Sequence, residues 1–209
     1  MAKKDSSFLK LVLSLSIVTV IAASALAAVY GITKDPIDQS KLNKKNNAIK
    51  LVQPGFDTQN GVIKEVKVLP EGESDSLTVY ISESDNALFG AAVETYTNMA
   101  FSGRFEIMVG FDKEGKIMGT EVLKANETPG LGDKIDKKKD NFSLQFNGKN
   151  PGTMKMKVKK DGGDIDAITA ATISSKAFCD AVDRAFKAFQ IVVAQYESQK
   201  SEPTQVTSN

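Results

Sequence analysis

The chain has 209 residues, of which 41% are hydrophobic, and this is enough for one domain with a buried core and for additional segments. Its 27 basic and 26 acidic residues leave a formal net charge of +1, so the overall charge gives no indication of nucleic-acid binding. The chain has no histidine, which excludes His-based catalytic triads, His-ligated haem and the usual zinc and copper sites. Its single cysteine, Cys179, excludes an internal disulfide and an iron–sulfur cluster held by this chain alone.

A short basic N-terminus precedes an uncharged apolar run. Residues 1–10 contain Lys3, Lys4 and Lys10 against one acid, and residues 11–33 carry no charge. As a helix, this run would be roughly 34 Å long at about 1.5 Å per residue. That length is sufficient to cross a hydrocarbon core of about 30 Å. Because lysines precede the span, we expect residues 1–10 to lie in the cytoplasm and the rest of the chain to lie outside it.

A cleaved signal peptide is the alternative to a membrane anchor, because Ala25-Leu26-Ala27 resembles a small-x-small processing site. The apolar run is longer than the hydrophobic region of most signal peptides, and it continues past this site through Val29 and Ile32. We therefore predict an uncleaved, single-pass transmembrane helix over residues 11–33.

Residues 34–60 are predicted to form a juxtamembrane helix and a linker. Asp35 would cap the helix with its side chain, Pro36 would occupy the first helical position, and Pro54-Gly55 would end it. The helix would carry a narrow apolar stripe, with its lysines on the other face. We interpret these lysines as a solvated surface, with a contact to anionic lipid head groups as the alternative.

Residues 61–124 are predicted to form mainly strands. Apolar and polar residues alternate over residues 77–81 and 104–111, and this period of two is typical of a β-strand. The sequence from Asp112 to Gly115 is typical of a turn and predicts a hairpin between the second of these strands and residues 116–123.

Shorter elements are predicted after these strands. We expect a short polar helix over residues 134–141 and a strand over residues 154–158 whose lysines form one basic face. This face is interpreted as solvated surface, with a docking face for an acidic redox partner as the alternative. A final amphipathic helix is expected from about Ser174 to Gln195, with the thiol of Cys179 buried beside its apolar stripe.

Together these elements predict an α+β fold. A single N-terminal transmembrane helix would be followed, at residues 61–196, by an extracytoplasmic domain of mainly antiparallel strands with flanking helices. Residues 197–209 are polar and are expected to form a flexible tail.

Two segments contain residues suited to binding a cofactor. In Glu127–Gly132, the pair Pro129-Gly130 favours a type II turn, and the glycines let the backbone approach a flat ligand; a simple turn after a hairpin is the alternative. Residues 164–175 combine two carboxylates and several hydroxyls around Ala170-Ala171, just before the last helix. The start of a helix has unpaired N–H groups and a partial positive charge, so it can bind a phosphate; a plain helix cap is the alternative.

The sequence from Asp166 to Thr172 (DAITAAT) resembles the flavinylation motif of the covalent FMN-binding domain. That domain occurs in the RnfG subunit of Rnf electron-transport complexes and in the NqrC subunit of sodium-pumping NADH:quinone reductases. In this family an acid is followed after two residues by Ser or Thr and then by Gly-Ala-Thr, and the last threonine bears FMN through a phosphoester bond. The resemblance implies that Thr172 carries FMN and that Asp166 helps a flavin transferase recognise its target.

The segment Glu127–Gly132 (ETPGLG) is similar to the second signature of the family, which lines the flavin site. The resemblance therefore implies a set of residues that bind the cofactor: Glu127, Thr128, Gly130, Leu131, Gly132, Thr169, Ala170 and Ala171. It implies no catalytic residue and no metal site.

The resemblance also implies a function and a location. The chain would be a subunit of an ion-translocating oxidoreductase in the bacterial cytoplasmic (inner) membrane, with its FMN-binding domain in the periplasm. Its partners would be other membrane and iron–sulfur or flavin subunits of an Rnf-type complex, and a flavin transferase that uses FAD and Mg²⁺ during maturation. The short chain without large insertions favours RnfG over NqrC.

Ala170 departs from the family pattern, which usually has glycine at this position. If the position has a positive φ, the alanine β-carbon costs about 1–2 kcal/mol. Two other classes of function are the alternatives to a flavoprotein. One is an anchored binding or scaffold domain in which residues 169–172 only cap a helix. The other is a periplasmic hydrolase, which is disfavoured because no nucleophile–base pair can be assembled without histidine.

Overall fold

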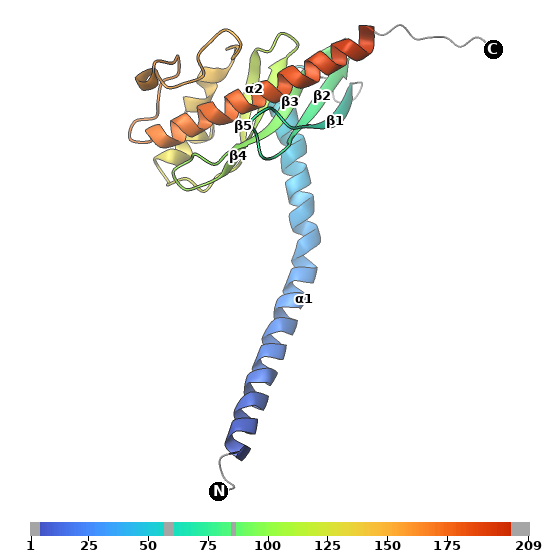
Figure 1. Cartoon of the computed structure of the whole chain (residues 1–209), viewed down its shortest axis with the longest axis vertical. Helices are drawn as coiled ribbons and strands as arrows, with labels where there is room; N and C mark the ends of the chain where they lie inside the picture. The colour runs from blue at the N-terminus through green and yellow to red at the C-terminus, as the bar shows by residue number, and fades with distance from the viewer. Residues whose placement is uncertain (1–4, 57–60, 85–86, 202–209) are drawn as a thin grey trace, which may run out of the picture. The chain divides into compact units, whose positions relative to one another are not determined.

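The computed structural model of the chain describes residues 5–56, 61–84 and 87–201 (Figure 1). The chain divides into two compact units, residues 1–44 and 45–209. The boundary falls within the first helix. The second unit therefore contains the last turns of that helix together with all the strands and the last helix.

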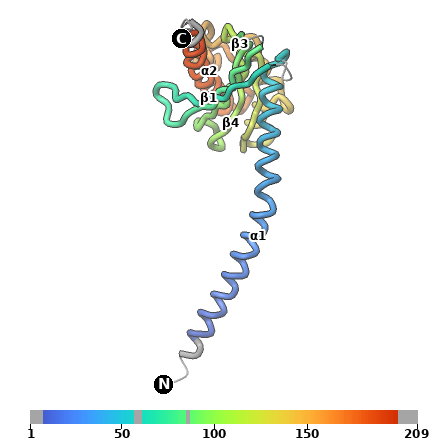
Figure 2. Tube along the Cα trace, turned by 90° about the vertical axis from the view of Figure 1, so that its right-hand side faces the viewer, coloured from blue at the N-terminus to red at the C-terminus, as the bar shows by residue number. Residues whose placement is uncertain are grey.

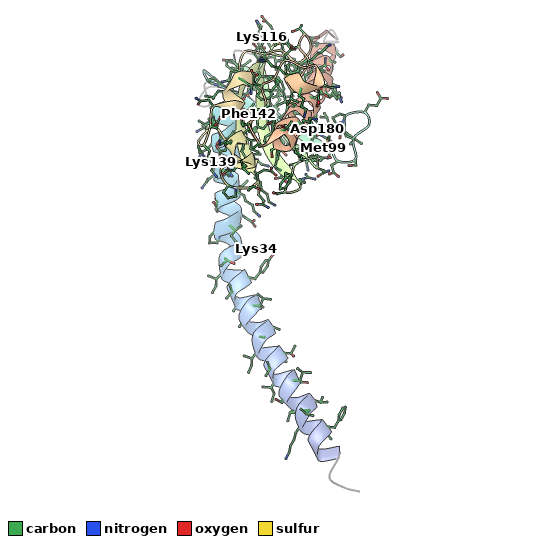
Figure 3. All side chains as sticks on the ribbon, turned by 90° about the vertical axis from the view of Figure 1, so that its left-hand side faces the viewer. Lys34, Met99, Lys116, Lys139, Phe142 and Asp180 are labelled. Atoms are coloured by element: carbon green, nitrogen blue, oxygen red, sulfur yellow. The ribbon has the colours of Figure 1, made fainter. Side chains whose placement is uncertain are left out.

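Helix α1 extends from Asp5 to Val52. Its residues 8–44 are exposed, and the helix is long and apolar enough to cross a membrane. Figure 3 shows the side chains of this N-terminal part around the helix. The sequence predicts a separate helix that begins at Asp35, but α1 continues through Pro36. Proline lacks an N–H group and removes one backbone hydrogen bond there, while the turns on either side continue the helix.

Five strands form one antiparallel sheet in the order β1-β2-β3-β4-β5. This order follows the chain because short connections join consecutive strands. The strands predicted over residues 61–124 are confirmed, and so is the hairpin at its predicted turn, where Gly115 has a φ of 81°. The strands are β1 (Val62–Val68), β2 (Leu77–Ser84), β3 (Ala87–Thr97), β4 (Phe105–Asp112) and β5 (Ile117–Lys124).

The two faces of the sheet are covered by different helices. Helix α2 (Thr172–Ser201) lies along one face (Figures 1 and 2), where Phe111 of β4 packs against Phe189 with ring centroids 4.9 Å apart. Successive side chains of a strand point to opposite faces, and Met108 of β4 accordingly packs with Val52 near the end of α1. Both faces of β4 are therefore buried, one against α2 and the other against the end of α1.

The segment between β5 and α2 is mostly irregular. The predicted strand over residues 154–158 is absent from this described segment: Met156 and Val158 are buried, but Val158 forms only an isolated bridge with Ile165. Apolar and polar residues alternate here because one side of the segment is buried and the other is exposed, but no neighbouring strand pairs with it in the described part of the chain. The polar helix predicted over residues 134–141 does not form: only the end of a 3-10 helix, η1 (Gly132–Ile135), overlaps it, and turns follow. Two further 3-10 helices, η2 (Phe142–Phe146) and η3 (Lys159–Asp161), lie later in the segment.

Helix α2 is longer than predicted, because it begins at Thr172 and ends at Ser201. Residues 197–201, predicted as part of a flexible tail, belong to α2, and residues 202–209 lie outside the described part of the chain. Cys179 is buried as predicted, and this burial raises the pKa of its thiol to about 12. The predicted apolar stripe of α2 is buried: Phe178, Val182, Ala185, Phe186 and Phe189.

Candidate functional site

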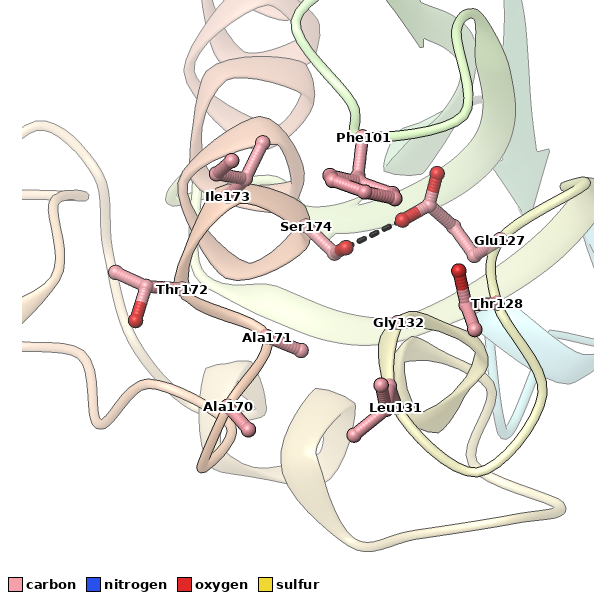
Figure 4. Close-up of a pocket in the computed structure, with 10 residues that line it drawn as sticks. All are labelled: Phe101, Glu127, Thr128, Leu131, Gly132, Ala170, Ala171, Thr172, Ile173 and Ser174. Carbon is pink, nitrogen blue, oxygen red and sulfur yellow. Dashed lines mark hydrogen bonds between the residues drawn. The ribbon is translucent and has the colours of Figure 1, made fainter.

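A cavity of about 310 Å³ lies where the β3–β4 connection, the loop after β5 and the start of α2 meet (Figure 4). Its walls come from three segments that are far apart in the sequence, and both sequence motifs contribute to it. The lining residues are Phe101, Glu127, Thr128, Leu131, Gly132, Ala170, Ala171, Thr172, Ile173 and Ser174.

The loop after β5 contains the predicted turn at residues 128–131. The N–H of Leu131 donates a hydrogen bond to the carbonyl of Thr128 (3.2 Å), and Gly130, the third residue of the turn, has a φ of 76°. This bond and the positive φ are the features of a type II turn, in which Pro129 fixes φ at the second position. The turn directs the side chain of Leu131 and the start of η1 to the cavity.

A second turn of the same kind precedes α2. The N–H of Ala171 donates to the carbonyl of Ile168 (3.0 Å), and Ala170, the third residue, has a φ of 62°. Among the described residues, Ala170 is the only one other than glycine with a positive φ. The position where the family usually has glycine thus requires the left-handed conformation, and the alanine β-carbon costs about 1–2 kcal/mol there.

The start of α2 is fixed by Ser175. This residue is buried, and its hydroxyl donates to the carbonyl of Ala171 (3.0 Å) and accepts from the N–H of Ile168 (2.9 Å). Ala171 is the N-cap residue, since its carbonyl also accepts from the N–H of Ser175 (3.1 Å), and alanine has no side-chain oxygen to act as a cap. Within the described residues, the N–H groups of the three residues after Ala171 have no acceptor. These groups and the helix dipole are suited to a phosphate.

Glu127 links the three walls of the cavity. Its carboxylate is buried and accepts hydrogen bonds from the N–H of Ser102, in the β3–β4 connection (2.9 Å), and from the hydroxyl of Ser174, in α2 (Figure 4). Gly132 packs against this pair, because a β-carbon at this position would lie 2.6 Å from the Oγ of Ser174. The shape of the cavity therefore depends on a buried carboxylate and on a residue without a side chain.

The hydroxyl groups of residues 169–175 differ in their availability. Those of Ser174 and Ser175 are buried and bonded to other protein groups. Thr172 is half-buried at the edge of the cavity, and its hydroxyl forms no hydrogen bond with a described residue; Figure 4 shows it directed away from Glu127. Thr169 is exposed and does not line the cavity. Among residues 169–175, Thr172 is thus the residue whose hydroxyl is both at the cavity and without a hydrogen bond to a described residue; Thr128, which also lines the cavity, lies in the loop after β5 and not at the helix start.

The structure brings most of the predicted site residues together. Gly130 and Thr169 are central residues of the two turns and lie beside the lining residues without lining the cavity themselves. Asp166 lies outside it, with its carboxylate 2.8 Å from Lys159 and its N–H donating to Gln145 (2.8 Å). The predicted residues that line the cavity are Glu127, Thr128, Leu131, Gly132, Ala170, Ala171 and Thr172.

Three lining residues were not predicted from the sequence: Phe101, Ile173 and Ser174. Placing the helix start at Thr172 instead of Ser174 would have identified the last two, because they form the first turn of α2. Phe101 belongs to a connection without periodicity, between Ala100 and Ser102, and neither neighbour marks it as part of a site.

A larger cavity of about 630 Å³ lies further along α2. Its lining includes Met99, Met154 and Met156 from two loops, and Cys179 and Asp180 from α2; Met99 and Asp180 are labelled in Figure 3. It contains none of the residues of the two motifs. No group of three or more Cys, Asp or Glu side chains in the described part of the chain could hold a metal ion. The smaller cavity is therefore the candidate site.

Comparisons with known proteins indicate the same region. The FMN-binding domain family matches residues 101–187, which include both motifs. Over 189 residues the chain is 34% identical to the RnfG subunit of the ion-translocating oxidoreductase complex of Shewanella amazonensis, covering 86% of this chain and 87% of the relative. The corresponding RnfG subunits of Aliivibrio fischeri and Vibrio parahaemolyticus are 34% and 32% identical, over 79% and 81% of this chain and 82% and 83% of the relatives.

Proposed function

Because the chain belongs to the RnfG family of ion-translocating oxidoreductase complex subunits and carries an FMN-binding domain, we propose that it is a membrane-anchored subunit of such a complex with FMN bound covalently to Thr172. The predicted membership of the FMN-binding family is confirmed, and so is the preference for RnfG over NqrC. The covalent bond, the site residues and the partners are the proposed part.

The observation that carries this proposal is the hydroxyl of Thr172 beside the N–H groups at the start of α2, none of which has a partner among the residues that the structure describes. A phosphoester on this oxygen would place a negative charge at the positive end of the helix, where backbone donors are available. The two serines that follow are buried and already hydrogen-bonded, and Thr169 does not line the cavity. These features favour Thr172 as the attachment residue.

The other residues of the cavity fit the remainder of FMN. Leu131 is 42% exposed and offers an apolar contact for the isoalloxazine ring, while Gly132 lets Glu127 and Ser174 pack closely at the cavity wall. Glu127 and Thr128 would contact polar atoms of the flavin, and Gly130 would shape the turn that presents them. Thr169, Ala170 and Ala171 would bring the backbone close to the phosphate. When bound, FMN supplies one- and two-electron transfer, which this chain has no residues to perform by itself.

The attachment reaction would be carried out by a flavin transferase with FAD as the donor. The oxygen of Thr172 would bond to the phosphorus of the FMN half of FAD, the pyrophosphate P–O bond would break, and AMP would leave as the hydroxyl proton is lost. Asp166 would serve as a recognition residue, since its side chain is 71% exposed and stands before the acceptor in the chain.

The apolar part of α1 supports the assignment of a membrane anchor. The lysines among residues 1–10 favour a cytoplasmic N-terminus, which would place residues 61–196 on the periplasmic side of the bacterial inner membrane. A protein whose only electron carrier is FMN must receive electrons from one carrier and pass them to another. We infer that its partners are other membrane subunits and iron–sulfur or flavin subunits of the complex.

Coexpression of the full-length chain with a flavin transferase tests the covalent attachment. After denaturing gel electrophoresis, the wild-type band should fluoresce and a Thr172→Val band should be dark, because valine keeps the β-branched shape but has no oxygen. Thr169→Val tests the neighbouring threonine, and Thr153→Val is a matched control at an exposed position that does not line the cavity.

Thr169→Val and Thr153→Val should both remain fluorescent. A fluorescent Thr172→Val band would place the attachment on another residue. A dark wild type would favour an anchored binding or scaffold domain without covalent flavin.

A further inference from the structure

We propose that Phe101 forms an aromatic wall of the flavin site and packs against the isoalloxazine ring. This inference rests on the proposed function, in which FMN occupies the smaller cavity. Phe101 belongs to neither sequence motif, and it reaches the cavity from the β3–β4 connection (Figure 4).

Phe101 is exposed, whereas phenylalanine side chains are usually buried. It is 65% exposed, while the other phenylalanines described in the second unit are buried or half-buried. Two further apolar residues at the same cavity, Leu131 and Ile173, are 42% and 50% exposed. Figure 4 shows Phe101 and Leu131 on either side of the hydrogen bond between Glu127 and Ser174. Apolar side chains that remain exposed around one cavity are suited to the apolar faces of a ligand.

The connection that carries Phe101 is tied at both of its ends. On one side, the N–H of Ser102 donates to the carboxylate of Glu127 (2.9 Å). On the other, the hydroxyl of Thr97 donates to the carboxylate of Asp180 in α2 (2.8 Å). These bonds hold the chain on both sides of Phe101, so little backbone freedom is lost when a ligand packs against the ring.

The chemistry of the ligand matches the exposed ring. The isoalloxazine of FMN is a flat aromatic system, and aromatic rings prefer offset or edge-to-face contacts with one another. Thr172 and Phe101 line the same cavity, so a flavin anchored at Thr172 has the ring of Phe101 at its site. Glu127 is then a positioning residue for Phe101, because it holds the N–H of the adjacent Ser102.

The same connection offers a matched control. Met99 is 61% exposed, close to the value for Phe101, but it lines the larger cavity. If the flavin ring were shielded by any large exposed side chain of this connection, Met99→Ala and Phe101→Ala would reduce the shielding equally. A contact with a flavin in the smaller cavity would be lost only in Phe101→Ala.

Quenching of flavin fluorescence by acrylamide in the detergent-solubilised holoprotein measures this contact. An aromatic packing contact corresponds to about a 2- to 12-fold change in the equilibrium between a packed and an unpacked flavin ring. The bimolecular quenching constant of Phe101→Ala should therefore rise severalfold, within about that range. Phe101→Tyr, which keeps an aromatic ring, and Met99→Ala should match the wild type.

The covalent flavin content of each variant is measured first and should equal that of the wild type, because Phe101 is not the acceptor. A Phe101→Ala protein with a normal flavin content and an unchanged quenching constant would overturn the inference. An equal rise in Met99→Ala would overturn it as well. A wild type without covalent flavin would instead contradict the proposed function on which the inference rests, so the two failures are distinguishable.

Discussion

Two turns at the cavity have the same backbone geometry but different residues where φ is positive. In the turn at residues 128–131 this residue is Gly130 (φ 76°), and in the turn at residues 168–171 it is Ala170 (φ 62°). Glycine adopts this conformation without a steric penalty, whereas the alanine β-carbon costs about 1–2 kcal/mol. The first turn is therefore specified by its own residues, and the second needs support from its surroundings.

That support comes from side chains outside the second turn. Ser175 bonds to backbone groups at both ends of the turn, the N–H of Ile168 and the carbonyl of Ala171. The amide of Gln145 bonds to both backbone groups of Asp166, at 2.8 Å and 3.0 Å. Backbone strain persists where surrounding contacts determine the conformation, and it is frequent at functional sites. Here the strained turn is the one that leads into Thr172.

The largest effect is expected just after the first turn, at Gly132. A methyl group there would collide with Glu127 and Ser174. Overpacking of this kind typically costs 1–3 kcal/mol, so Gly132→Ala should lower the free energy of unfolding by about 2–3 kcal/mol. Chemical denaturation of the full-length protein in detergent, followed by near-UV circular dichroism, measures the change. Wild-type stability in this variant would show that Glu127 and Ser174 do not pack tightly on this glycine.

A smaller effect is expected at Gly130, where a β-carbon would have no neighbour within 4 Å and the only penalty is backbone strain. The strain of about 1–2 kcal/mol is partly offset by the loss of about 0.4–1 kcal/mol of freedom in the unfolded chain. Gly130→Ala should therefore destabilise the protein by about 1 kcal/mol. A loss as large as that of Gly132→Ala would mean that the first turn depends on more than its positive φ.

The reverse substitution, Ala170→Gly, should have the opposite sign. It relieves the strain at φ 62° and adds freedom to the unfolded chain, so the expected net gain is about 0.5–1 kcal/mol. The same denaturation measurement applies, with Ala167→Gly as a control at an exposed alanine without a positive φ. If Ala170→Gly were as destabilising as the control, the two turns would not differ in strain.

Near neutral pH the smallest effect on stability is expected from Cys179, whose labelling reports whether the strained turn opens the start of α2. Its thiol is buried, and burial raises its pKa from 9.0 to about 12, so it should react little with iodoacetamide at pH 8 until the protein unfolds. Between pH 9 and 12 the unfolded state loses this proton first, so stability should fall as pH rises through that range. Rapid labelling of the folded protein would show that α2 opens locally.

The sequence was informative where a periodic pattern or a specific residue pair determines the structure. Alternation predicted β4, and Pro129-Gly130 predicted the first turn, because these features depend on near neighbours. The strand expected at residues 154–158 does not form, because strand formation also requires a partner, which alternation does not supply. Phe101 was missed for a similar reason: its place at the cavity depends on hydrogen bonds to Glu127 and Asp180, which are distant in sequence.

Peptide mapping of the holoprotein tests most directly whether Thr172 is the residue that carries FMN. Trypsin should release residues 161–176 as one peptide, which contains Thr169, Thr172, Ser174 and Ser175. If Thr172 carries FMN, this peptide gains the mass of one FMN less one water, and fragmentation assigns the gain to Thr172. A gain assigned to any other residue, or no gain in protein coexpressed with a flavin transferase, would contradict this assignment.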